Sequence, residues 1–153
     1  SIKTNSMKYL LILIVPLFLT NCKTVKDEKV EQGVVGTVLW FEGNLMPSPG
    51  VPAPEGKPIE RTVLICELTN SSQVKGDAPI YESIPDQIVK EIKSDKNGVF
   101  KTELPVGEYS VFVKEDSGYF ANSFDAKNNI CVLKIEKDKI TEMKIDVNYK
   151  ASF

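Results

Sequence analysis

The sequence predicts an all-β domain in which seven short strands form a sandwich or a barrel. Three observations support this prediction. Several segments are rich in β-branched and aromatic residues, turn signals separate them, and no intervening segment has a sustained helical period. The chain of 153 residues is 26% charged and 42% hydrophobic, which suits one globular domain. The predicted strands are residues 34–41, 62–68, 88–93, 99–104, 109–114, 130–136 and 140–149.

The first element, residues 1–21, is predicted to be a signal peptide. Met7 and Lys8 form a short basic start, and residues 9–19 are almost wholly apolar apart from Pro16. That stretch is 11 residues long, whereas a helix needs about 20 residues to cross a bilayer. Its length and flanks fit the apolar region of a secretory signal. Residues 1–6 precede the expected initiator Met7 and are left out of the fold prediction.

The end of this signal, residues 19–22 (LTNC), resembles a bacterial lipobox, with Asn21 in place of the usual small residue. The resemblance implies cleavage just before Cys22 and attachment of diacylglycerol to its sulfur. Acyl chains contribute about 0.8 kcal/mol per buried methylene, so two or more chains hold a protein stably on a membrane. We therefore expect an outer-membrane lipoprotein of a bacterial cell envelope, bound to the membrane through lipid on Cys22. The alternative is an ordinary secretory signal with an incidental cysteine.

Residues 22–32 are polar after Cys22 and are predicted to be a tether. Within them, residues 26–28 (KDE) resemble the export signal of surface lipoproteins in the Bacteroidetes group. That resemblance implies exposure at the cell surface. The alternative is a solvated linker without a sorting function.

The last predicted strand shows the clearest two-residue period. One face is expected to be the core face and consists of Thr141, Met143, Ile145, Val147 and Tyr149. The residues between them, Glu142, Lys144, Asp146 and Asn148, are expected in water. Residues 95–98 (DKNG) predict a hairpin turn, because Asn and Gly tolerate positive φ.

The turns also support a family resemblance. Residues 94–100 (SDKNGVF) and 104–109 (LPVGEY) strongly resemble the carboxypeptidase regulatory-like domain, and residues 34–38 (VVGTV) resemble its opening strand. The resemblance implies that residues 33–153 form a transthyretin-like, seven-stranded antiparallel Greek-key sandwich. It does not imply peptidase activity, because these motifs belong to structural turns.

Two cysteines remain once Cys22 is assigned to lipid. Cys66 and Cys131 both fall in predicted strands and share their faces with apolar residues, so both are expected to point into the core. In an oxidising envelope they can form a disulfide. The alternative is a pair of buried free thiols that act as small hydrophobic residues.

Five aromatic residues are candidates for a binding surface. Trp40 and Phe41 are adjacent, so a strand sends them to opposite faces and one of them is expected at the surface. Tyr119, Phe120 and Phe124 fall in a predicted long loop, which is interpreted either as a lid over the sandwich end or as a contact surface. The proline-rich residues 47–54 are interpreted as a stiff spacer or as a recognition segment.

The sequence shows no catalytic constellation. It has no histidine, which removes Ser-His-Asp and Cys-His arrangements and the commonest metal ligand. Acidic residues such as Glu103, Glu108, Glu115 and Asp116 are scattered as on a solvated face. A net charge of −2 provides no basic excess for nucleic acid. We therefore expect no enzyme, no metal, no cofactor and no nucleic-acid partner.

The leading hypothesis is a non-catalytic, lipid-anchored envelope or cell-surface module. It would bind a protein or glycan partner, or form an accessory part of a surface assembly, because loops on a rigid scaffold commonly carry binding. One alternative is a purely structural spacer. The other is a hydrolase accessory with an unrecognised acidic site, which requires two carboxylates that converge in a cleft.

Overall fold

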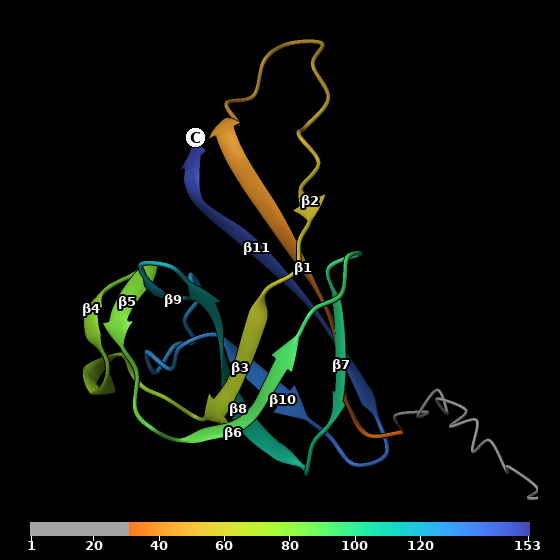
Figure 1. Cartoon of the computed structure of the whole chain (residues 1–153), viewed down its shortest axis with the longest axis vertical. Helices are drawn as coiled ribbons and strands as arrows, with labels where there is room; N and C mark the ends of the chain where they lie inside the picture. The colour runs from red at the N-terminus through yellow and green to blue at the C-terminus, as the bar shows by residue number, and fades with distance from the viewer. Residues whose placement is uncertain (1–30) are drawn as a thin grey trace, which may run out of the picture.

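A computed structural model describes residues 31–153 as two β-sheets packed face to face (Figure 1). The predictions for the signal peptide, for Cys22 and for most of the tether lie outside these residues. No helix in the part that the structure describes is long and apolar enough to cross a membrane. The described elements are β1 (Gly33–Asn44), β2 (Lys57–Pro58), β3 (Thr62–Glu67), the 3-10 helix η1 (Ser71–Gln73), β4 (Lys75–Asp77), β5 (Ile80–Ser83), β6 (Ile88–Lys93), β7 (Val99–Glu103), β8 (Gly107–Glu115), β9 (Gly118–Phe120), β10 (Val132–Ile135) and β11 (Ile140–Ser152).

The predicted all-β sandwich is confirmed, and each of the seven predicted strands is present, but the structure adds four short ones. The larger sheet is antiparallel in the order β4-β5-β9-β8-β3-β6, and β10 also pairs with β8. In the smaller sheet β1 lies between β11 on one side and β2 and β7 on the other. The first and last strands, β1 and β11, run parallel, so the expectation of a purely antiparallel sandwich is wrong for this sheet. Parallel neighbours need a long crossover, and here the whole intervening domain supplies it.

The core lies between the sheets and follows the two-residue period of the strands. Val38 of β1 and Val147 of β11 are fully buried, and Val63 and Val111 cover them from the larger sheet. In β11 the predicted alternation is confirmed, because the odd-numbered residues are the more buried and Glu142 is exposed. The inner faces of both sheets therefore form one apolar cluster.

Strand β8 is buried on both faces, which the sequence did not predict. Val111 faces the smaller sheet, while Phe112 points the other way and is also fully buried. The ring of Tyr81 meets that of Phe112 edge to face at 6.2 Å, and the backbone N–H of Thr69 donates to the Ser110 hydroxyl at 2.8 Å. Residues 69–86, which lie between two predicted strands, thus fold back as η1, β4 and β5 and cover the second face of β8.

The turn at residues 95–98 is confirmed, although it does not form a hairpin. The Asp95 carboxylate accepts hydrogen bonds from the N–H groups of Asn97 and Val99, at 2.8 and 2.9 Å. Gly98 has a φ of 74°, and a Cβ there would lie 2.4 Å from the carbonyl oxygen of Val38. The strands that the turn joins, β6 and β7, belong to different sheets, so this motif closes the sandwich from one layer to the other.

The second turn motif is fixed by its tyrosine. The hydroxyl of Tyr109 donates to the backbone carbonyl of Pro105 at 2.9 Å, which ties the start of β8 to the turn before it. This hydrogen bond explains the Tyr at the end of the motif, and it is structural. The transthyretin-like topology itself stays a prediction.

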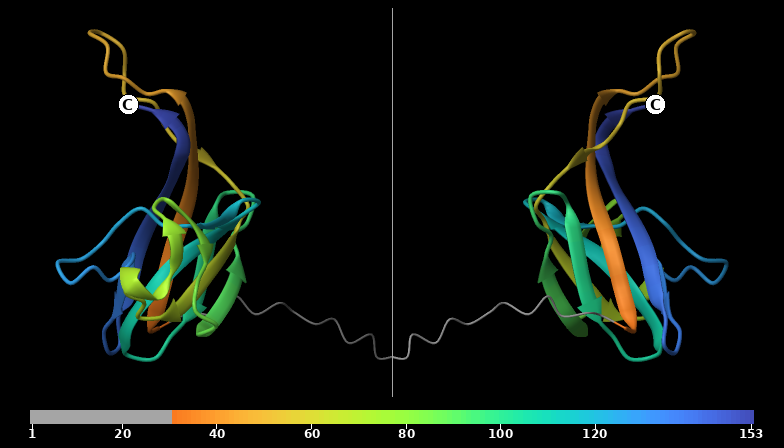
Figure 2. Two further views of the ribbon diagram at one scale, coloured as in Figure 1. Left: turned by 90° about the vertical axis from the view of Figure 1, so that its left-hand side faces the viewer. Right: turned by 90° about the vertical axis from the view of Figure 1, so that its right-hand side faces the viewer.

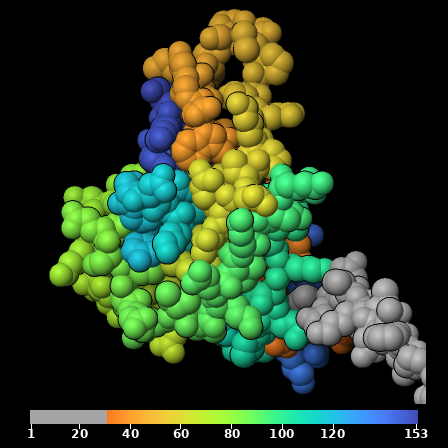
Figure 3. Space-filling model, in the orientation of Figure 1, coloured from red at the N-terminus to blue at the C-terminus, as the bar shows by residue number. Residues whose placement is uncertain are grey.

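Beyond the sandwich, β1 and β11 continue as a two-stranded ribbon that we call the arm, defined as residues 41–56 and 148–153. Figures 1 and 2 show that the arm projects from one end of the sandwich, and Figure 3 shows it standing clear of the body. The register of β1 against β11 shifts between Trp40 and Glu42, at the base of the arm. A bulge increases local twist and bends a strand, so it gives the ribbon its own direction.

Candidate functional site

The outer face of the smaller sheet carries the candidate site. Along β1 the even-numbered residues Val34 and Val38 point into the core, so the odd-numbered residues point outward. These outward residues are Val35, Thr37, Leu39 and Phe41, and each is half-buried. No described element packs over them as a third layer (Figure 2).

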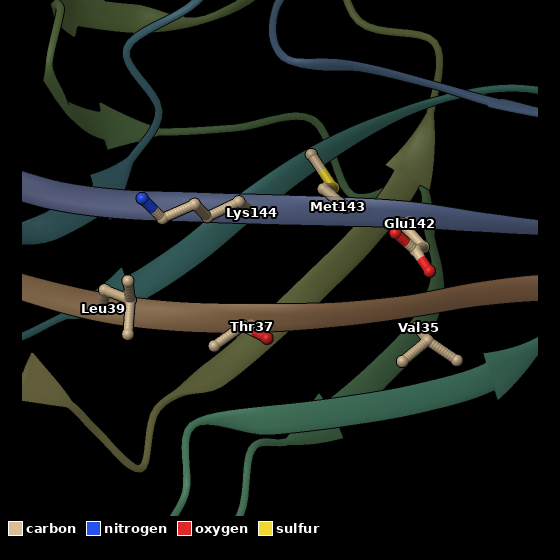
Figure 4. Close-up of a pocket in the computed structure, with 6 residues that line it drawn as sticks. All are labelled: Val35, Thr37, Leu39, Glu142, Met143 and Lys144. Atoms are coloured by element: carbon tan, nitrogen blue, oxygen red, sulfur yellow. The ribbon is translucent and has the colours of Figure 1, made fainter. Parts of the chain in front are cut away.

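An open hollow of about 500 Å³ lies along this face, as Figure 4 shows. Its lining comes from two neighbouring strands and consists of Val35, Thr37, Leu39, Glu142, Met143 and Lys144. In the register of the sheet, Val35 pairs with Glu142 and Thr37 with Lys144. The apolar row on β1 is therefore bordered by a row of alternating charge on β11.

Two further hollows continue the apolar row onto the arm. The first, of about 210 Å³, is lined by Phe41, Leu45, Pro54, Asp146, Asn148 and Phe153. The second, of about 290 Å³, is lined by residues 44–48 and 51–54. Leu45 and Pro54 border both hollows. We call the row of Val35, Thr37, Leu39, Phe41, Leu45 and Pro54 the outer track.

Charges beside the outer track largely neutralise one another. The ammonium group of Lys144 lies 3.3 Å from the Asp146 carboxylate and 5.9 Å from the centre of the Phe41 ring. Exposed ion pairs of this kind contribute roughly 0 to 1 kcal/mol to stability, so this pair does little for the fold. The track thus presents an apolar centre with a polar border of low net charge.

One glycine allows the returning loop to approach the track closely. A Cβ at Gly56 would lie 2.5 Å from the Phe41 ring and 2.8 Å from the Cβ of Leu39. The backbone at Gly56 therefore packs directly on these two side chains. Any larger residue there must displace Phe41 or lift the loop away from β1.

A buried cluster of polar and aromatic side chains fixes the base of the arm. The Glu115 side chain is only 4% exposed, and its carboxylate accepts from the Arg61 guanidinium at 2.8 Å and from the Tyr149 hydroxyl at 3.0 Å. The rings of Trp40 and Tyr149 meet edge to face at 5.4 Å. We call Trp40, Arg61, Glu115 and Tyr149 the base cluster.

This cluster corrects the expectation that Glu115 belongs to a solvated face. Burial of the Tyr149 hydroxyl, together with its hydrogen bond to the Glu115 carboxylate and the charge of that carboxylate, raises the pKa of this hydroxyl. The guanidinium carbon of Arg61 and the ammonium of Lys150 lie 5.6 and 5.7 Å from the centre of the Trp40 ring. Glu115 thus joins the sandwich to the arm through Arg61 and Tyr149, and no local sequence pattern predicted this role.

The five candidate surface aromatics do not form one surface. Trp40 and Phe41 lie on opposite faces of β1 as predicted, with Phe41 outward on the track. Phe120 is fully buried in the core and Tyr119 packs against the core, because Gly118–Phe120 is strand β9 and not a loop. Phe124 is exposed on a separate loop that projects from the sandwich (Figure 2). The expectation that residues 119 and 120 lie in a long loop is therefore wrong, and Phe120 has almost no exposed surface for a partner. Phe41 is the one member that joins the candidate site.

Cys66 and Cys131 are both buried, as predicted, and both are free thiols. The disulfide is not formed because a strand stands between them. Cys66 and Val132 both pair with Ser110 of β8, from opposite sides, and two strand spacings amount to about 10 Å. A disulfide needs Cα atoms within about 7 Å. Burial raises the pKa of the Cys66 thiol to about 11 and that of Cys131 in the same direction.

The residues described contain no group of three His, Cys, Asp or Glu side chains that could hold a metal ion. A comparison of the chain with protein-family models, curated proteins and solved structures found no match. The resemblance to the carboxypeptidase regulatory-like domain therefore still rests on the turn motifs. The geometry of the outer track is the observation from which a function can be argued.

Sequence reasoning missed most of this track. Residues 34–41 are almost continuously apolar, which is typical of a strand covered on both faces. The described part of this chain covers one face only. An apolar strand with one uncovered face could have pointed to Val35 and Leu39 as surface residues. Leu45 could not have been found in this way, because it joins the track only through the fold of the arm.

Proposed function

We propose that the protein is a non-catalytic, lipid-anchored module of a bacterial outer membrane that binds a partner protein along the outer track. The observation that carries the proposal is the uncovered apolar row on β1. Burying apolar surface contributes roughly 25 cal/mol per Å², and a central strand with apolar residues on both faces normally has cover on both. A partner that covers this row would complete the sheet packing.

Placement of the chain supports the same proposal. Glu31, where the described residues begin, lies at the end of the sandwich opposite the arm (Figure 1). An anchor on Cys22 would hold that end near the membrane and direct the track and the arm outward. A tether of ten residues spans at most about 35 Å, so it would keep the domain close to the bilayer.

The anchor is tested by mass spectrometry of the mature N-terminus. We expect a chain that begins at acylated Cys22 and pellets with outer membranes, while Cys22→Ser stays unprocessed or unlipidated. A free N-terminus elsewhere in the mature chain contradicts the lipid anchor. This test leaves partner binding as a separate question.

Binding is tested by introducing negative charge on the track. Thr37→Glu and Leu39→Glu place carboxylates among half-buried, outward side chains, so we expect lost partner binding with little change in the unfolding midpoint. Val89→Glu, on the exposed edge strand β6, is the matched control and should bind as wild type. Chemical cross-linking in intact cells is the measurement. Equal cross-linking by all three variants would remove the track from the proposal.

A further inference from the structure

The arm ends in a tip that has no charged side chain, unlike the rest of the surface. We define the arm tip as residues 45–54 and Phe153. Residues 43–54 contain no Asp, Glu, Lys or Arg, although charged residues make up 26% of the whole chain. The side chains of Met46, Val51 and Phe153 are 59%, 65% and 70% exposed. Large apolar side chains gathered on one exposed, uncharged projection mark an interaction site.

The tip is stiffened before it meets any partner. Four prolines fix φ within it, namely Pro47, Pro49, Pro52 and Pro54. The N–H of Val51 donates to the carbonyl of Ser48 at 3.1 Å, and that of Leu45 to the carbonyl of Ser152 at 2.8 Å. A loop restrained in this way loses less conformational entropy on binding than a flexible one.

The base cluster then fixes the direction in which the tip points. Trp40 and Tyr149 come from the two arm strands, and Glu115 and Arg61 from the sandwich. Their hydrogen bonds and ring contacts join the ribbon to the body where the register of β1 shifts. Because β1 starts at the end of the sandwich opposite the arm, the tip lies far from the first described residues (Figure 1).

The charges near the arm tip favour a protein over a lipid surface as its binding partner. Segments that bind membranes combine apolar residues with an excess of Lys or Arg. Here the charges nearest the tip are balanced, with Glu42 and Glu55 against Lys57 and Lys150, and Lys57 lies 4.0 Å from Glu42. A proline-rich, uncharged projection instead suits an apolar groove lined by aromatic residues, the kind of surface with which proteins bind proline-rich segments.

We propose that the arm tip inserts into an uncharged, apolar groove of the partner protein, with Met46 and Val51 as the inserted side chains. This inference rests on the proposed function and names the part of the partner contact that the tip supplies. The partner is defined by its chemistry, as a protein whose groove offers apolar and aromatic surface and no compensating charge.

The experiment places a photo-crosslinking amino acid at Met46 or Val51 of the full chain in cells. Val106 is the control position, since it is 58% exposed and lies in the turn beside the Glu31 end. We expect one protein adduct from both tip positions and none from Val106. Excess soluble wild-type domain should compete, whereas a domain with Met46→Ser and Val51→Ser should not.

The partner identified by mass spectrometry is then purified for titration. The Met46→Ser/Val51→Ser variant should bind it at least tenfold more weakly than wild type, and Val106→Ser within twofold. Equal adducts at Val106, adducts with a second copy of this chain, or tip-dependent sedimentation with phosphatidylethanolamine and phosphatidylglycerol vesicles would each overturn the proposal.

The two proposals fail in distinguishable ways. If the tip variant binds as wild type while Leu39→Glu abolishes binding, the tip inference is wrong and the track keeps its function. If neither the tip nor the track positions give any protein adduct, both proposals are overturned.

Discussion

The sandwich and the arm share two strands, β1 and β11, yet these strands are stabilised differently in the two regions. In the sandwich they bury Val38 and Val147 completely against the larger sheet. In the arm they lack a facing sheet, and Phe41 and Leu45 line open hollows instead. A two-stranded ribbon is marginally stable alone, so the arm depends on the base cluster and the returning loop. The comparison shows that the inner face of these strands stabilises the sandwich, whereas the candidate binding surface follows their outer face and continues onto the arm.

The largest contrast is expected from truncating one apolar side chain in each region. Phe112→Ala empties a fully buried site on β8 and should lower the free energy of unfolding by about 3 to 5 kcal/mol. Val51→Ala removes an exposed side chain at the arm tip and should change it by less than about 0.5 kcal/mol. Urea unfolding of both variants measures the difference. Similar losses would show that the tip is part of the folding unit.

The next largest loss of stability is expected from a substitution in the base cluster. Glu115→Ala leaves Arg61 and the Tyr149 hydroxyl without their buried acceptor and should cost about 2 to 3 kcal/mol. The control is Glu60→Ala, whose exposed pairing with Lys93 at 3.8 Å should contribute less than about 0.5 kcal/mol. Hydrogen exchange should also accelerate in the arm more than in the sandwich. Uniform acceleration would contradict a local role for Glu115.

Because the Cys66 thiol is buried in the sandwich, we expect the free energy of unfolding to depend on pH in the alkaline range. Its folded pKa is raised from about 9 to about 11, so the folded state holds the proton more tightly than the unfolded state. This stabilisation is fully present below pH 9 and is lost as pH rises through 11, by on the order of 2 to 3 kcal/mol. Thermal unfolding of wild type and Cys66→Ala across this range isolates the effect from tyrosine ionisation. Parallel curves for the two proteins would exclude it.

The smallest effect on stability is expected from the tip variant that should impair binding most. Met46→Ser combined with Val51→Ser exchanges exposed side chains and should keep the unfolding free energy within about 0.5 kcal/mol of wild type. Calorimetry provides the measurement, with Val106→Ser as the reference. A loss above about 2 kcal/mol would mean that the tip packs against this protein itself.

Local patterns predicted most of the sandwich, because they depend on neighbours in sequence. The alternation in β11 placed Ile145 inward, and the turn at Asp95 followed from its side-chain acceptor and Gly98. The short strands β4 and β5 were not predicted, because each has only a few residues and is stabilised by packing on the second face of β8. The candidate site was predicted at one residue, Phe41, because its other members come together through the tertiary fold.

By itself the sequence determined the fold class and the turns, since each depends on residues that are close along the chain. The signal and the lipid attachment at Cys22 stay predictions of the sequence. Only the tertiary structure decided that β8 separates Cys66 from Cys131, that Glu115 is buried against Arg61, and that β1 and β11 leave the sandwich together as an arm. These features join residues far apart in sequence. Their energies depend on burial and distance, which a local pattern does not encode.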